Sequence, residues 1–109
     1  MYSTIQTAIL EGIQTRKVQV EVDISNGMPA FDMVGHLSAE VREGKERIRI
    51  ALHSIGVLLP AKRITINLSP AHIRKSGTGF DLPIAVAIMQ SLGLVTRESC
   101  GGRLFIGEL

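Results

Sequence analysis

The sequence predicts an α+β fold of two layers (an α/β two-layer arrangement), with two main helices packed on one face of a mixed β-sheet. Residues 18 to 24 alternate valine or isoleucine with polar side chains, which is typical of a strand with one solvated face. Apolar residues between 41 and 55 recur at helical spacing instead. Strands and helices then follow each other in the order ββ(β)αβαβ, which favours helices layered on a sheet.

Three strands are expected in the first third of the chain. Tyr2–Leu10 is rich in Ile and Thr, and Val18–Ile24 has the strict alternation described above. The two runs predict a β-hairpin that turns within Glu11–Arg16. Asn26-Gly27 is a strong turn signal, and it precedes a shorter third strand, Ala30–Val34.

The first helix is expected between Ser38, which can cap its N-terminus, and Gly56, which can end it. Its apolar positions run from Val41 to Ile55. The opposite face carries acids and bases interleaved at spacings that allow mutual pairing, namely Glu40, Arg42, Glu43, Lys45, Glu46, Arg47 and Arg49. We interpret this face as solvated and self-neutralised.

The second half of the chain predicts a strand, a loop, a helix and a last strand. Ile64–Leu68 alternates at period two and is followed by a polar loop, Ser69–Gly79. Asp81 is predicted to be the N-cap of a helix that is apolar on most sides and ends at Gly93. Leu104–Ile106 is predicted to be the final strand.

Composition excludes several classes of protein. The chain has 109 residues, 45% of them hydrophobic, and a net charge of +2, which fits one folded domain spanning residues 1–109 and argues against disorder. The longest mostly apolar run, Leu82–Leu92, is about half of the roughly 20 residues that span a bilayer, so no membrane contact is expected. No secretory signal is present, and the single cysteine, Cys100, favours a reducing compartment, so we predict a cytoplasmic protein.

Four strings of the sequence resemble one family in order along the chain. They are VEVDISNGMPAFDMVG (Val20–Gly35), VREGKERIRIAL (Val41–Leu52), LPAKRITINLSPAHIRKSGTGFDLPIAVAI (Leu59–Ile88) and FIGEL (Phe105–Leu109). They resemble the N-terminal domain of the magnesium-chelatase-like (ChlI-like) YifB/ComM family of bacterial AAA+ ATPases. The resemblance implies a fold similar to the proteolytic domain of Lon protease.

The resemblance also implies a function. It suggests a non-catalytic accessory or substrate-handling domain, with ATP and Mg²⁺ bound by a downstream AAA+ domain and no cofactor in this part. The chain itself has no GxxxxGK[ST] loop, and the strand pattern of Leu104–Leu109 stops early, as expected of a fragment. The implied partners are the protein's own AAA+ domain, neighbouring subunits of a ring and DNA, since one branch of the family is linked to DNA branch migration during natural transformation.

Four basic residues are the candidate contacts for an anion or nucleic acid. Lys62 and Arg63 precede the Ile64–Leu68 strand, and Arg74 and Lys75 follow it, with no acid nearby before Asp81. Weak DNA binding is therefore one alternative function. Whether the four residues form one patch or two stays open at this point.

A Lon-like serine peptidase is the other alternative. Such enzymes place a nucleophilic serine at the start of the second helix, where this chain has Asp81. An ionised carboxylate is a poor nucleophile towards an amide, and Ser76 and Thr78 belong to the preceding loop. No catalytic residue is therefore assigned. His36, His53 and His72 lie far apart in the sequence, so no metal site is assigned either.

Overall fold

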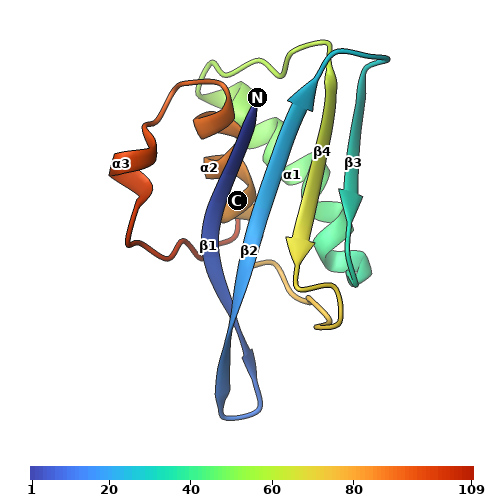
Figure 1. The fold of residues 1–109 in the computed structure, drawn as a ribbon. Helices are drawn as coiled ribbons and strands as arrows, with labels where there is room; N and C mark the ends of the chain where they lie inside the picture. Colours follow the sequence, from blue (N-terminus) through green and yellow to red (C-terminus); the bar gives the residue numbers. More distant parts are fainter.

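Four strands form one mixed sheet with the order β1-β2-β4-β3 in the computed structural model, which describes residues 1–109 (Figure 1). Their bounds are β1 Tyr2–Glu11, β2 Gln14–Ser25, β3 Ala30–Val34 and β4 Arg63–Ser69. β2 pairs antiparallel with both β1 and β4, whereas β3 pairs parallel with β4. β1 and β3 are therefore the edge strands.

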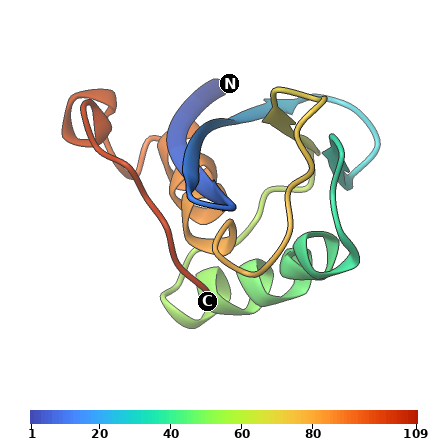
Figure 2. The ribbon, with the colours of Figure 1, turned by 90° about the horizontal axis from the view of Figure 1, so that it is seen from below.

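Helices cover one face of this sheet, as Figure 2 shows from below. They are α1 (Ala39–Ser54) and α2 (Asp81–Ser91), with a short third helix, α3 (Arg97–Cys100), at the side of the molecule. The predicted α+β class with two main helices on one face is confirmed. Ser38 caps α1 as predicted, because its hydroxyl oxygen accepts the Val41 N–H at 3.3 Å. α3 was not predicted.

The core lies between the sheet and both main helices, and it includes Ile48 and Leu52 of α1. Period-two residues of β2 and β4 point towards the helices and have almost no exposed surface, namely Val18, Val20, Val22, Ile24, Ile64, Ile66 and Leu68. α2 is buried on nearly every side, as its lack of a polar face predicts. No helix has the combination of length and apolar character needed to cross a bilayer.

The β1–β2 hairpin extends beyond the body of the fold (Figure 1). β2 pairs with β4 only from Gln19 onwards, so the segments Ala8–Glu11 and Gln14–Lys17 pair only with each other. We call these two segments and their turn the hairpin arm. The turn is tighter than predicted, with only Gly12 and Ile13 between the strands, and Gly12 has a φ of 63°, which glycine adopts readily.

The predicted last strand, Leu104–Ile106, is wrong. Only one bridge joins this segment to β1, between Leu104 and Gln6. The tail instead crosses to the start of α2, where the Gly107 N–H donates to the Gly79 carbonyl at 3.0 Å and the Leu82 N–H donates to the Gly107 carbonyl at 2.9 Å. The tail is therefore held by backbone bonds to both β1 and the start of α2, and it does not extend the sheet as a strand.

Candidate functional site

Asp81 is not the N-cap of α2, contrary to the sequence-based prediction. Phe80 occupies the cap position, and no side chain bonds to the helix start. The Asp81 carboxylate, whose side chain is only 2% exposed, faces α1 and accepts two hydrogen bonds from Arg47, at 2.6 Å from Nε and 3.1 Å from Nη2. A two-point contact with a guanidinium is stronger than a bond to a neutral amide, which explains why the carboxylate turns away from its own helix.

Gly44 makes this ion pair possible. A Cβ atom at Gly44 would lie 2.5 Å from Oδ1 of Asp81 and 3.2 Å from Nη2 of Arg47, so any larger residue would displace the pair. The hydrogen bond to Asp81 raises the pKa of the Arg47 guanidinium above its ordinary value. Asp81 also accepts the Leu109 N–H at 3.3 Å. The pair therefore holds α1, α2 and the chain's last residue together.

The two hydroxyls beside the helix start do not form a catalytic site with Asp81. Ser76 is exposed and has no side-chain hydrogen bond. The Thr78 hydroxyl donates to the Glu108 carboxylate at 2.7 Å, in an exposed contact that adds to the attachment of the tail. Asp81 itself is committed to Arg47.

The four predicted anion contacts do not form one surface. Lys62 and Arg63 lie at the start of β4, whereas Arg74 and Lys75 lie beyond its end, and seven residues at about 3.3 Å each separate the groups by roughly 20 Å. Arg63 lies 3.9 Å from the Asp32 carboxylate. Arg74 is exposed. Lys62, Arg63 and Arg74 stay predicted contacts, divided between two places.

Lys75 cannot be a surface contact, and this part of the prediction is wrong. Its side chain is fully buried, and its ammonium donates to the Pro70 carbonyl within the same loop. Its backbone pairs with the segment that precedes α1, since its N–H donates to His36 and its carbonyl accepts from Ser38. Burial lowers the pKa of the Lys75 ammonium below its ordinary value.

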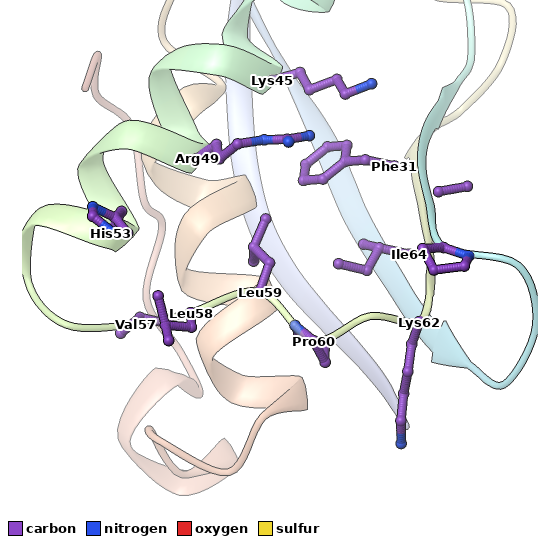
Figure 3. Close-up of a pocket in the computed structure, with 12 residues that line it drawn as sticks. Phe31, Lys45, Arg49, His53, Val57, Leu58, Leu59, Pro60, Lys62 and Ile64 are labelled. Atoms are coloured by element: carbon purple, nitrogen blue, oxygen red, sulfur yellow. The ribbon is translucent and has the colours of Figure 1, made fainter.

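One predicted contact, Lys62, and three other basic residues line a groove of about 610 Å³ between α1, β3 and the loop that follows α1 (Figure 3). Lys45 and Arg49 reach from α1 towards Phe31, and His53 and Lys62 lie towards the ends of the groove. No acidic residue lines it. Its other walls are Pro29, Ala30, Val57, Leu58, Leu59, Pro60 and Ile64. We call this the α1–β3 groove.

The sequence does contain a signal for this groove. Lys45, Arg49 and His53 follow one another at intervals of four residues, which places them on one face of α1. The prediction of a self-neutralised helix face missed them, and no ion pair forms within α1. Arg47 instead leaves that face to bind Asp81, and the Lys45 ammonium lies 5.7 Å from the centre of the Phe31 ring.

Similarity to known proteins shows which family the chain belongs to. The family model described as subunit ChlI of Mg-chelatase matches residues 20–109. YifB of Salmonella typhimurium is 39% identical over 96% of this chain, and YifB of Escherichia coli is 38% identical over 98%. Competence protein ComM of Haemophilus influenzae is 47% identical over 90% of this chain. The chain spans about a fifth of the length of these relatives. The chain therefore belongs to the Mg-chelatase ChlI family, as a domain of the magnesium-chelatase-like YifB/ComM type.

Proposed function

We propose that this chain is a non-catalytic accessory domain of an AAA+ ATPase, which contacts substrate or neighbouring subunits while another part of the protein hydrolyses ATP. Family membership supports this proposal, and so does the length of the relatives, which leaves ample sequence for a separate ATPase domain. In this proposal ATP and Mg²⁺ bind that other domain, and the protein works in the cytoplasm as part of a ring.

The Arg47–Asp81 pair is the observation that carries the non-catalytic assignment. The resemblance to Lon-type enzymes would put a nucleophile at the start of α2, where this chain has a carboxylate that is 2% exposed and bound to a guanidinium. A carboxylate held in this way can neither attack an amide nor accept a proton from a neighbouring hydroxyl. The residues at this position therefore support a structural role.

The proposal extends to an ATPase that acts on DNA during natural transformation. Its support is the name of the Haemophilus influenzae relative, a competence protein that is 47% identical over 98 residues. A DNA substrate would be moved by the assembled ring, with this domain as one of its contact surfaces.

Two measurements test the proposal. The 109-residue chain, incubated with casein and fluorogenic peptides, is expected to show no turnover. Turnover that disappears in Ser76→Ala would replace the accessory role with a hydrolase. The full-length protein is expected to release phosphate from ATP, equally in the parent and in Ser76→Ala. A full-length protein that does not hydrolyse ATP would contradict the ATPase assignment.

A further inference from the structure

We propose that the α1–β3 groove binds an extended acidic peptide segment of a protein partner. This inference rests on the proposed contact role of the domain, and it adds the place of contact and the chemistry of the partner.

The charge of the groove indicates an anionic partner. Lys45 and Arg49 extend into it, Lys62 and His53 lie at its ends, and none of its twelve lining residues is acidic. No carboxylate lies within ion-pair distance of any of these four residues. The charges of Lys45, Arg49 and Lys62 are therefore not held in ion pairs within the chain, and they favour a ligand with carboxylates or phosphates.

The apolar part of the groove favours a peptide over a nucleic acid. Half of the lining residues are hydrophobic, and one of them, Leu58, is 71% exposed. A sugar-phosphate backbone gains little from such a surface, whereas apolar side chains of a peptide are stabilised by it. Base stacking needs an accessible aromatic face, but Phe31 is only 8% exposed and has Lys45 over its ring. A volume of about 610 Å³ holds several side chains of an extended segment.

The edge of the sheet provides backbone groups for the same ligand. β3 pairs only with β4, and the Ala30 N–H donates inwards to the Lys62 carbonyl. Because backbone groups alternate in direction along a strand, those of Phe31 and Met33 point to the free edge. Arg42 already donates to the Met33 carbonyl at 3.3 Å, which leaves the Phe31 N–H and carbonyl open beside the groove. An extended peptide can bond to this edge while its acidic side chains reach Lys45 and Arg49.

Binding to the 109-residue chain tests the proposal by fluorescence anisotropy. The probes are three labelled molecules: a peptide of alternating Glu and Leu, a peptide of alternating Lys and Leu, and oligothymidine. The Glu-Leu peptide is expected to bind and the Lys-Leu peptide is not. Lys45→Glu/Arg49→Glu is expected to weaken binding of the Glu-Leu peptide about tenfold, because each charge reversal removes an attraction and adds a repulsion, which together are worth about threefold. Leu58→Asp is expected to weaken it as well.

The matched control is Lys17→Glu/Arg103→Glu, which changes the net charge equally at exposed residues outside the groove and is expected to bind like the parent. If circular dichroism shows that Lys45→Glu/Arg49→Glu is unfolded, Lys45→Gln/Arg49→Gln takes its place. Failure of the Glu-Leu peptide to bind the folded parent would overturn the proposal. Oligothymidine that binds more tightly, and that the groove variant releases, would assign the groove to nucleic acid. Self-association that the groove variant abolishes would assign it to a second copy. All of these results concern the groove alone. The proposed contact role of the domain would be overturned by a different result, cleavage of a peptide by the 109-residue chain.

Discussion

Removing either partner of the Arg47–Asp81 pair is expected to destabilise the fold, and the two removals are expected to differ. The Asp81 side chain is 2% exposed, whereas the Arg47 side chain is 27% exposed. Arg47→Met leaves a carboxylate with no access to water, at a cost of about 3–5 kcal/mol. Asp81→Ala leaves a guanidinium that can turn towards solvent, so we expect a smaller cost of about 2–3 kcal/mol, the value of the lost charge-assisted hydrogen bonds.

Urea unfolding followed by circular dichroism measures both effects. A chain of 109 residues is expected to have a free energy of unfolding of about 5–16 kcal/mol, so either loss is a large share of the total. With an m value of about 1.5 kcal/mol/M, Arg47→Met lowers the midpoint by about 2–3 M and Asp81→Ala by about 1.5–2 M. The double variant is expected to cost less than the sum of the two, because each single change leaves the other charge without its partner.

Asp81→Asn distinguishes this ion pair from a helix cap. Asparagine caps a helix about as well as aspartate, so a cap would survive the change with little loss. The ion pair would not, since the amide carries no charge and replaces one acceptor oxygen with a donor that faces the Arg47 donors. An Asp81→Asn variant as stable as the parent, or an Arg47→Met variant more stable than Asp81→Ala, would refute the reasoning.

Three further results are expected. Gly44→Ala should destabilise the parent by about 1–3 kcal/mol through its clash with the pair, yet stabilise the Asp81→Ala variant by about 1 kcal/mol through helix propensity; urea midpoints that fall equally in both backgrounds would contradict this. Burial lowers the pKa of Lys75 in the folded chain. At pH values between that lowered pKa and the unfolded value of about 10.4, Lys75 carries its proton in the unfolded chain but not in the folded chain. The parent's free energy of unfolding should therefore rise with pH in this window, by up to about 1.4 kcal/mol per pH unit relative to Lys75→Met. Urea midpoints across alkaline pH measure this, and a parallel pH dependence in both proteins would contradict it. With Lys75 buried, at most three of the four predicted basic contacts can neutralise phosphates, so duplex DNA binding should be weak, with a salt slope no steeper than about −3 in anisotropy titrations; a steeper slope, or tight binding at physiological salt, would contradict it.

Local patterns in the sequence predicted most of the fold. The alternation of β2 and β4, the apolar run of α2 and the Ser38 cap each depend on neighbours a few residues away. The prediction of a strand at Leu104–Ile106 was wrong, because the residue pattern is the same whether this segment joins a sheet or bonds to the start of α2. Only the position of Gly79 in space decides between these outcomes.

The candidate site was harder to predict, because its residues are brought together by contacts between distant parts of the chain. Asp81 and Arg47 are 34 residues apart, and an acid at a helix start is more simply explained as a cap. Gly44, which the sequence marks only as a weak helix residue, is explained by the space that the pair needs. Lys75 looks like any loop lysine until the loop folds its side chain inwards. The spacing of Lys45 and Arg49 could be read from the sequence, but the position of β3 across the groove from them could not.

The hairpin arm is expected to be less stable against local unfolding than the rest of the sheet. Its two segments pair only with each other, and its tip is fully open to water, with Ile13 102% exposed. A two-stranded ribbon of this kind is marginal in water, so the arm can open while the rest of β1 and β2 stays packed against α2. Amide hydrogens of the arm should then exchange with solvent far ahead of those in the sheet's centre. The stability of the domain, set by the core, is therefore separate from the stability of the arm, and a change at the arm's tip should leave the midpoint of global unfolding almost unchanged.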